Sequence, residues 1–284
     1  MSHDTQLSID AVAEALDRRS LLSGAVGLAA LPALGALGSP GALAHDAQGH
    51  RPDLYPGPKP QVAMLVYPDM VMIDLIGPLT VFQMLGFENH LVWKTRDPVR
   101  TETGISITPT ATFADCPRDL EILFAPGGIR GTTACMRDDA VLSFLADRGA
   151  SAKWVTSDCT GALIMGAAGL YRGYRATTLW PVMDLLPILG VIPTDERVVF
   201  DRNRASGAGA TAGIDFALAI GAKIRGEEAA KRAQLVIEYA PQPPFHSGNP
   251  KEAAPELVAK VREARVNMDG PAKEAAMAAA AKRS

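Results

Sequence analysis

The sequence predicts an α/β fold of the flavodoxin-like, doubly wound type, in which helices cover both faces of a mostly parallel sheet. Apolar runs of strand length alternate with helical segments from residue 62 onwards. Glycine-rich turns or a cysteine-bearing turn follow three of these runs. Because right-handed crossovers bring the carboxyl ends of parallel strands to one edge of a sheet, one pocket at that edge is expected to collect all three turns.

Five apolar runs are expected to form the sheet. The first is continuous, as is typical of a strand buried on both faces, and Pro68 and Asp69 end it. Thr and Ile alternate in residues 100–112, which suggests a hairpin or an excursion from the sheet. In chain order the expected strands are residues 62–67, 90–94, 121–125, 154–156 and 197–200.

Six helices are expected between and after these strands. Pro78 stands near the first turn of the first helix, where its missing N–H is not needed. The glycine run 206–213 lacks the GxGxxG spacing of a dinucleotide site, so we interpret it as a helix start packed closely beside the sheet edge. The expected helices are residues 78–85, 138–148, 162–168, 182–189, 214–224 and 227–239.

Composition describes an ordinary globular chain. Its 284 residues are 48% hydrophobic and 21% charged, which is too apolar for disorder and too short for three domains. The net charge is −3 and the basic residues form no cluster, so nucleic acid is not an expected partner. No Cys and His spacing suggests a metal site, and no cofactor is expected. The expected partner is a small-molecule substrate.

The first 44 residues are expected to be an export signal. Arg18 and Arg19 precede a weakly apolar run, residues 21–37, and a small-x-small cleavage pattern follows at residues 42–44. Paired arginines before such a run are typical of a twin-arginine signal. The run is shorter than the ~20 residues of a membrane helix, so no stable membrane insertion is expected once the signal is removed. The sequence therefore predicts a periplasmic or secreted protein, against the alternative of a chance arginine pair.

The rest of the chain is expected to contain one α/β domain with extensions. A polar segment with prolines and no hydrophobic period is expected to be a linker. At the other end, Leu257, Val258 and Val261 lie on one helical face with no obvious place in a finished sheet. The expected parts are a signal peptide at 1–44, a linker at 45–60, the α/β domain at 61–250 and a C-terminal helical extension at 251–284.

Cys159 stands where the expected strand 154–156 turns into the expected helix 162–168. A residue at such an elbow is exposed above the sheet and held at an unusual backbone angle. Gly161 and Gly166 let the helix approach its strand closely. The unpaired N–H groups and partial positive charge of the helix start are expected to favour the thiolate, which is the nucleophilic form. The alternative is an inert, buried structural thiol.

Two further turns are candidates for the same site. Asp74 lies between Ile73 and Leu75, and a carboxylate placed there after a strand is either a helix cap or a site acid. Gly127 and Gly128 follow the third strand, and their N–H groups can face a ligand because no side chain blocks them. A plain turn would need such glycines as well.

From Val62 to about Pro250 the chain resembles the ThiJ/PfpI superfamily, which has a flavodoxin-like fold and a nucleophilic cysteine on such an elbow. Within it the likeness is greatest to isonitrile hydratases and to the amidase-like half of certain transcription regulators. The pieces that carry the resemblance are residues 74–78, 126–128, 159–162, 166–170, 175–178, 211–216 and 238–239. Relatives on this fold commonly pair, so a homodimer is expected.

The resemblance implies a role for four residues. Cys159 would be the nucleophile and Asp74 its acid partner, and the N–H groups of Gly128 and Thr160 would bind the developing negative charge. Glutaminases of this fold pair a His with a Glu two residues on, and no His here has that neighbour. The peptidase-like members have His where this chain has Thr160. A Cys–Asp site remains.

Two residues depart from the pattern of the superfamily. Leu179 stands where a His is often found, and Asp158 stands where an apolar residue is common. A carboxylate directly before the nucleophile raises the pKa of the thiol if it points inward.

In an oxidising compartment Cys116 and Cys135 could pair in a disulfide, whereas export after folding is equally compatible with reduced cysteines.

The expected activity is cysteine-dependent hydration of a small molecule, with an isonitrile converted to an N-formamide. One alternative is a glyoxalase or deglycase-type activity on α-oxoaldehydes, which would use the same cysteine. The other is a ThiJ/PfpI domain that binds a ligand without chemistry.

Overall fold

The computed structural model describes residue 55 and residues 57–282, so the predicted export signal lies outside the described residues, as does most of the predicted linker. In chain order the elements are β1 (Gln61–Leu65), α1 (Met72–Met84), β2 (Glu88–Trp93), β3 (Val99–Arg100), β4 (Ser106–Ile107), β5 (Ala111–Thr112), β6 (Leu120–Ala125), α2 (Ile129–Met136), α3 (Asp139–Ser151), β7 (Trp154–Asp158), α4 (Gly161–Ala167), β8 (Arg175–Ala176), the 3₁₀ turns η2 (Trp180–Leu185) and η3 (Pro187–Leu189), β9 (Ile192–Pro193), β10 (Val198–Asp201), β11 (Arg204–Gly207), α5 (Ala212–Arg225), α6 (Glu227–Val236) and α7 (Pro255–Ala281).

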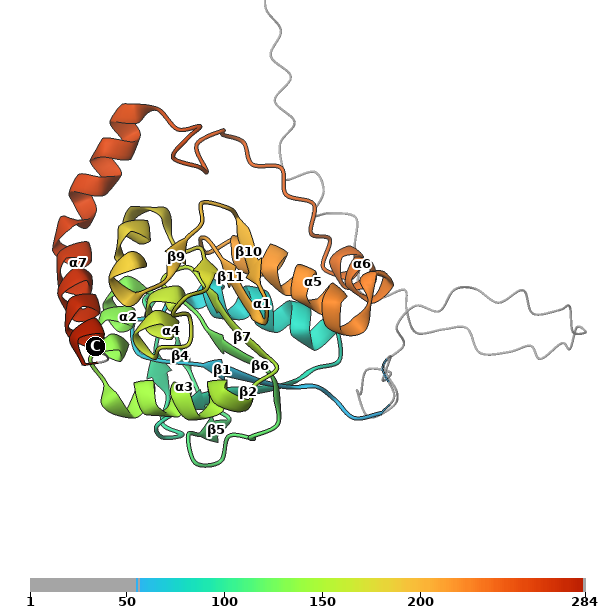
Figure 1. Cartoon of the computed structure of the whole chain (residues 1–284). Helices are drawn as coiled ribbons and strands as arrows, with labels where there is room; N and C mark the ends of the chain where they lie inside the picture. Colours follow the sequence, from blue (N-terminus) through green and yellow to red (C-terminus); the bar gives the residue numbers. More distant parts are fainter. Residues whose placement is uncertain (1–54, 56, 283–284) are drawn as a thin grey trace, which may run out of the picture. The chain divides into compact units, whose positions relative to one another are not determined.

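A seven-stranded sheet forms the centre of the domain (Figure 1), with the strand order β10-β11-β7-β6-β1-β2-β5. All neighbouring strands are parallel except β10 and β11, which are antiparallel. The middle strands β1, β6 and β7 are buried along almost their whole length. Burial on both faces explains why β1 and β6 are mostly apolar runs in the sequence, whereas β7 ends in the buried polar residues Thr156, Ser157 and Asp158 beside the elbow. The predicted fold class is confirmed.

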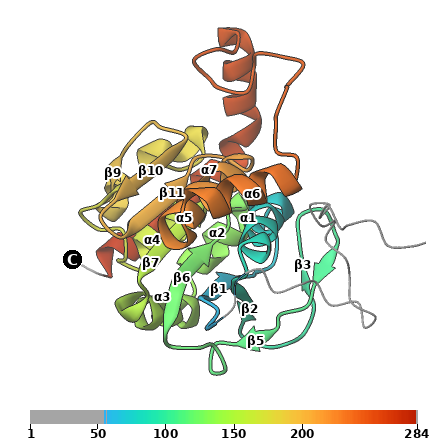
Figure 2. The ribbon, with the colours of Figure 1, turned by 90° about the vertical axis from the view of Figure 1, so that its right-hand side faces the viewer.

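Helices cover both faces of the sheet (Figures 1 and 2). Helices α1 and α5 lie on one face, and α6 packs against α5. Helices α3 and α4 lie on the other face, with α2 packed between α4 and α7. Phe124 of β6 stacks on Phe216 of α5 with ring centroids 5.9 Å apart, and Phe82 of α1 meets the same ring edge-on at 6.3 Å. These aromatic contacts join α1 and α5 to the sheet.

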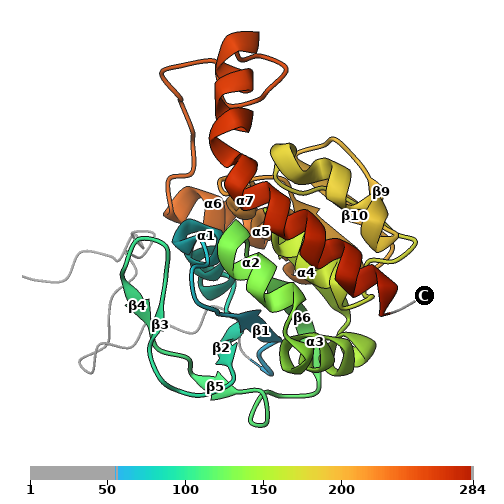
Figure 3. The ribbon, with the colours of Figure 1, turned by 90° about the vertical axis from the view of Figure 1, so that its left-hand side faces the viewer.

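Helix α7 packs against the domain mainly through its C-terminal half (Figure 3), and Arg262 nearer its start lies over the ring of Trp180 in η2 at 4.8 Å. The spacing of four alanines places them on one helical face, where small side chains allow close packing against α2, α4 and η3. In contrast, Leu257 and Val261 near the start of α7 are 45% and 37% exposed. The buried alanines are Ala272, Ala275, Ala276 and Ala279.

Three local expectations were wrong in extent or type. Helix α1 begins at Met72, well before Pro78, because a proline inside a helix removes only one backbone hydrogen bond and the apolar face of α1 is held by burial. Residues 204–207 form strand β11 between β10 and β7, although the small residues there have weak strand propensity. The expected helix 182–189 consists of two 3₁₀ turns, since Pro187 cannot continue an α-helix.

No helix in the described part of the chain is long and apolar enough to cross a membrane. Cys116, Cys135 and Cys159 are each buried and free, so Cys116 and Cys135 do not form a disulfide in this structure.

Candidate active site

Cys159 occupies the predicted elbow between β7 and α4. Its φ angle is 52°, a left-handed conformation that costs a residue with a side chain about 1–3 kcal/mol and must be held by its surroundings. The N–H of Cys159 donates to the carbonyl oxygen of Gly207 at 3.1 Å, and Thr178 Oγ1 donates to the carbonyl oxygen of Cys159 at 2.8 Å. Strand β11 and the segment after α4 therefore fix the backbone of the elbow from two sides.

The side chains of Asp74 and Cys159 approach each other beside Gly127, which has no side chain to separate them. Asp74 lies in the first turn of α1 and is fully buried, and its Oδ2 accepts the N–H of Gly127 at 3.0 Å. Its carboxyl and the Cys159 thiol each affect the pKa of the other. A β-carbon on Gly127 would stand within 2.7 Å of Asp74 Oδ2, of the Thr160 nitrogen and of Cys159 Cβ. The predicted pair is thus brought together, and only glycine fits between its members.

The carboxyl of Asp74 is poised to exchange a proton near neutral pH. Burial raises its pKa to about 7, although the Cys159 thiol and the hydrogen bond from the Gly127 N–H act in the opposite direction. The negative charge of Glu102 adds to the increase. Glu102 is held near Asp74 because its Oε2 accepts the N–H of Met72, at the start of α1, at 2.9 Å. A group with a pKa close to the working pH can both accept and donate a proton.

The sulfur of Cys159 is a thiol at rest. Burial raises its pKa well above the ordinary value, and the negative charges of Asp74 and Asp158 raise it further, whereas the Thr160 N–H lowers it. The expectation that the helix start favours thiolate was therefore wrong in its net effect. Helix α4 has only seven residues, and the cost of burying a charge next to two carboxyls outweighs its dipole.

The two predicted anion donors differ in availability. The N–H of Gly128 donates to Thr160 Oγ1 at 2.9 Å, whereas the N–H of Thr160 faces the sulfur. Thr160 Oγ1 also forms a hydrogen bond with Thr132 Oγ1 at 2.8 Å. Tyr67 OH lies 3.3 Å from Thr132 Oγ1 and donates a hydrogen bond to the carbonyl oxygen of Pro126 at 2.7 Å. Gly128 must exchange its partner before it can bind a substrate anion, so its role stays a prediction. Nothing in the sequence singled out Thr132 or Tyr67, because only the fold brings them to the elbow.

The two departures from the superfamily both lie near Cys159. Asp158, the residue before it, is fully buried and points inward, and its pKa is raised well above the ordinary value by burial and by Asp74. Leu179 follows Thr178, which bonds the Cys159 carbonyl, and lies 3.6 Å from the place of a β-carbon on Gly209.

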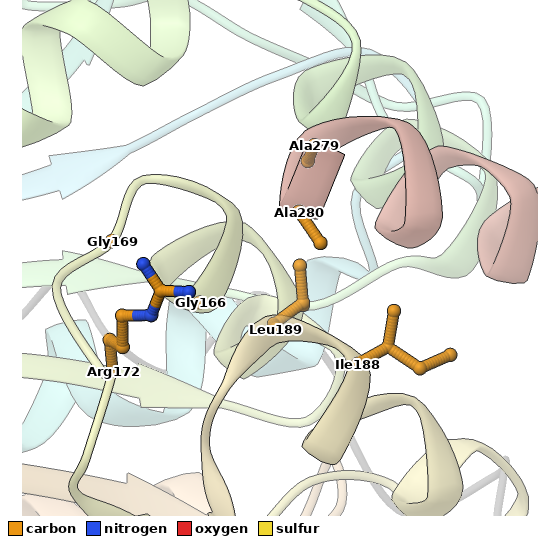
Figure 4. A pocket seen from close by; sticks show the side chains of 7 residues that line it. All are labelled: Gly166, Gly169, Arg172, Ile188, Leu189, Ala279 and Ala280. Atoms are coloured by element: carbon orange, nitrogen blue, oxygen red, sulfur yellow. The ribbon is translucent and has the colours of Figure 1, made fainter. Parts of the chain in front are cut away.

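A cavity of about 320 Å³ lies at the other end of α4 (Figure 4). It opens past the C-terminal end of that helix, whereas Cys159 precedes the N-terminal end, so it is not part of the Cys159 site. Its lining residues are Gly166, Gly169, Arg172, Ile188, Leu189, Ala279 and Ala280. Among residues 57–282 no cluster of His, Cys, Asp and Glu has the arrangement of a metal site.

Known proteins resemble this chain over the whole sheet domain. The model of the DJ-1/PfpI family matches residues 60–223, a range that contains all four predicted site residues. The isonitrile hydratase of Pseudomonas putida is 46% identical over 204 residues, which cover 72% of this chain and 89% of that protein. The deglycase PH1704 of Pyrococcus horikoshii is 27% identical over 135 residues, 47% of this chain and 81% of that protein. The crystal structure of a ThiJ/PfpI family protein from Pseudomonas syringae superposes with a TM-score of 0.77 and 46% identity, over 81% of this chain and 98% of that one.

Proposed function

Since the chain belongs to the DJ-1/PfpI family, we propose that it is a cysteine-dependent hydratase that converts small isonitriles to N-formamides. One observation carries the proposal: the buried carboxyl of Asp74 and the side chain of Cys159 flank Gly127, with Asp74 Oδ2 and Cys159 Cβ 2.6 Å and 2.7 Å from the place of a β-carbon there. This arrangement places a nucleophile and a proton carrier side by side. The similarity to an isonitrile hydratase, at 46% identity, supports the choice of substrate.

The first half of the reaction adds the thiol to the isonitrile R–N≡C. As the sulfur of Cys159 bonds to the terminal carbon, its proton passes to the Asp74 carboxylate, and Asp74 delivers that proton to the same carbon. The product is a thioimidate, in which carbon carries one hydrogen and remains bound to sulfur and nitrogen. A carboxyl with a pKa of about 7 suits both transfers.

The second half consumes water. The Asp74 carboxylate takes a proton from the water that adds to the thioimidate carbon, and then gives it to the nitrogen. The carbon–sulfur bond breaks, the hydroxyl proton returns to Cys159 and the N-formamide leaves. Charge that develops on the substrate is offset by the Thr160 N–H and, after it leaves Thr160 Oγ1, by the Gly128 N–H.

A second candidate is a deglycase or glyoxalase-type activity on α-oxoaldehydes, which the relative from Pyrococcus horikoshii favours. The purified mature protein separates the two candidates in a turnover assay with a panel of isonitriles and α-oxoaldehydes. Formation of N-formamides supports the hydratase. Turnover of oxoaldehydes alone would reject it, and turnover of neither class would support a binding domain without chemistry.

We propose that the protein is exported by the twin-arginine route. Residues 1–44 fused to a reporter are expected to bring it to the periplasm, and replacing both Arg18→Lys and Arg19→Lys is expected to stop export, because the route recognises the arginine pair. Cell fractionation measures the outcome, and mass spectrometry of the mature protein should find an N-terminus near His45. Unchanged export of the lysine pair would contradict the proposal.

We also propose a homodimer that uses the exposed start of α7. Exposed apolar side chains on one helical face, such as Leu257 and Val261, are stabilised when a second copy buries them. The double variant Leu257→Glu and Val261→Glu is expected to shift the mass measured by light scattering at micromolar concentration from dimer to monomer. Met277→Glu is the matched control, since Met277 is 56% exposed on the docked half of α7. A monomeric wild-type protein would reject the proposal.

A further inference from the structure

The hydroxyl group of Tyr67 is buried beside the candidate active site, and the proposed reaction makes no use of it. Tyr67 follows β1 and is fully buried. A β-carbon on Gly131, in α2, would stand 2.6 Å from Cδ2 and 2.7 Å from Cε2 of its ring, so this glycine lets α2 pack directly on the ring. The hydroxyl donates to the carbonyl oxygen of Pro126 at 2.7 Å. Burial raises the pKa of the phenol well above its ordinary value, so it stays neutral and keeps its proton to donate.

The acceptor of this hydrogen bond belongs to the peptide group that also holds Asp74. The carbonyl of Pro126 and the N–H of Gly127 are the two polar ends of one planar, trans peptide group, and they point in opposite directions. Tyr67 OH donates to the first end, and Asp74 Oδ2 accepts from the second at 3.0 Å. One rigid unit therefore connects the phenol to the carboxyl.

The carbonyl oxygen of Pro126 is enclosed on its other side. Pro126 and Gly127 are both buried. A β-carbon on Gly161, the first residue of α4, would stand 2.6 Å from this oxygen, so the start of α4 packs directly against it. A carbonyl that lost the phenol would be left buried without this donor, which costs free energy unless the peptide group turns.

Two threonines continue the hydrogen bonding around Gly127. The single hydroxyl hydrogen of Tyr67 is used by the carbonyl described above, so Tyr67 OH can only accept from Thr132 Oγ1, at 3.3 Å. Thr132 Oγ1 lies 2.8 Å from Thr160 Oγ1, which accepts the N–H of Gly128 at 2.9 Å. The chain starts at the peptide group after Gly127 and ends at the one before it. Hydrogen bonds in such a chain strengthen one another.

Building on the proposed function, we propose that Tyr67 is a positioning residue: through the Pro126–Gly127 peptide group, its hydroxyl fixes the direction of the N–H that holds the carboxyl of Asp74 beside Cys159. The space there is narrow, because the place of a β-carbon on Gly127 is 2.6 Å from Asp74 Oδ2 and 2.7 Å from Cys159 Cβ. A turn of the peptide group would take the N–H away from the carboxyl. Tyr67 itself takes no part in the proton transfers.

The first test measures the ionisation of Asp74 and needs no substrate. Mature protein labelled with ¹³C at its aspartate carboxyl carbons is titrated by NMR, and the signal of Asp74 is assigned by its loss in Asp74→Asn. The wild-type midpoint should lie at about 7. Tyr67→Phe keeps the ring and removes the hydroxyl. Since the Gly127 N–H lowers the pKa of Asp74, weakening its hold should raise the midpoint by about half a pH unit. The variant leaves in place the titratable groups that act on Asp74, namely Cys159, Asp158 and Glu102.

Tyr171→Phe is the matched control. Tyr171 is also fully buried, and its hydroxyl also donates to a backbone carbonyl, that of Ala205 in β11, at 2.8 Å. The same atom is lost in both variants, so both should be less stable in thermal unfolding, but only Tyr67→Phe should move the midpoint of Asp74.

A second variant changes the same hydrogen bond in the opposite direction. Incorporation of 3-fluorotyrosine at Tyr67 keeps the hydroxyl, and the electron-withdrawing fluorine makes it a stronger donor. The Gly127 N–H should then be held more firmly on Asp74, and the midpoint of Asp74 should fall below that of the wild type. This variant keeps the test decisive if Tyr67→Phe does not fold.

The third test uses substrate. In Tyr67→Phe, kcat for an alkyl isonitrile is expected to fall about three- to tenfold with little change in KM, the factor that one ordinary hydrogen bond supplies. The rise of kcat/KM with pH should move upward together with the midpoint of Asp74, and Tyr171→Phe should change neither. An Asp74 midpoint that is the same in the wild type and in every folded Tyr67 variant would overturn the inference. A wild-type protein that converts no isonitrile, with the midpoint still shifted in the variants, would reject the proposed hydration and leave the positioning of Asp74 by Tyr67 in place.

Discussion

Replacing Cys159→Ala is expected to reduce turnover of every isonitrile to the background rate. The variant keeps the elbow and the Asp74 carboxyl but has no atom that can form the covalent adduct, and a nucleophile cannot be replaced by the groups around it. Steady-state formation of the N-formamide measures the effect. Trapping of the thioimidate on Cys159 by mass spectrometry is expected in the wild type and not in the variant.

Cys116→Ala is the matched control for this experiment. Cys116 is also a buried free thiol, but it lies before β6, away from the elbow. Its replacement should leave kcat unchanged. If the Cys159→Ala protein retained activity towards all isonitriles and oxoaldehydes tested, the chemistry assigned to this cysteine would be wrong, and a ligand-binding function would take its place.

Asp74→Asn is expected to slow isonitrile hydration by roughly 10²–10⁴-fold, the usual contribution of positioned acid–base catalysis. Asparagine has nearly the same shape and can still accept the Gly127 N–H, but its amide cannot carry the proton from sulfur to carbon. The loss should appear in kcat with little change in KM. Asp119→Asn provides the control, because it removes an exposed carboxyl from the segment directly before β6, at the opposite edge of the sheet from Asp74.

The pH profile gives Asp74 a second signature. Its pKa is raised to about 7, so it is protonated below that pH and cannot accept the proton of the thiol. As pH rises through about 7 the carboxylate forms while Cys159, with a pKa raised well above its ordinary value, stays protonated. In the wild type, kcat/KM should therefore increase through about pH 7 and then level off. A profile in Asp74→Asn that kept the same increase would assign this proton to another group.

Local sequence was sufficient for the architecture and for the central pair. Continuous apolar runs predicted the buried parallel strands, because doubly covered strands need apolar side chains on both faces. The turn after 154–156 predicted the elbow of Cys159, and the left-handed backbone there agrees with it. Asp74 was a candidate because parallel sheets collect the ends of their strands at one edge, and the resemblance to the ThiJ/PfpI superfamily selected the role of acid partner over that of a helix cap. These inferences depend on periodicity and chain order, which a sequence contains.

Only the tertiary structure decided the electrostatics of the site. The sequence predicted a thiolate at Cys159 from the helix start, whereas burial and two carboxyls keep it a thiol. The partner of the Gly128 N–H is Thr160 Oγ1, and the inward position of Asp158 depends on space left by β11 and α5. Burial and contacts between distant segments set a pKa, and neither is a property of neighbouring residues in the chain. The sequence therefore determined the elbow and the candidate pair Cys159 and Asp74, and the packing of the folded domain determined their remaining neighbours and their pKa shifts.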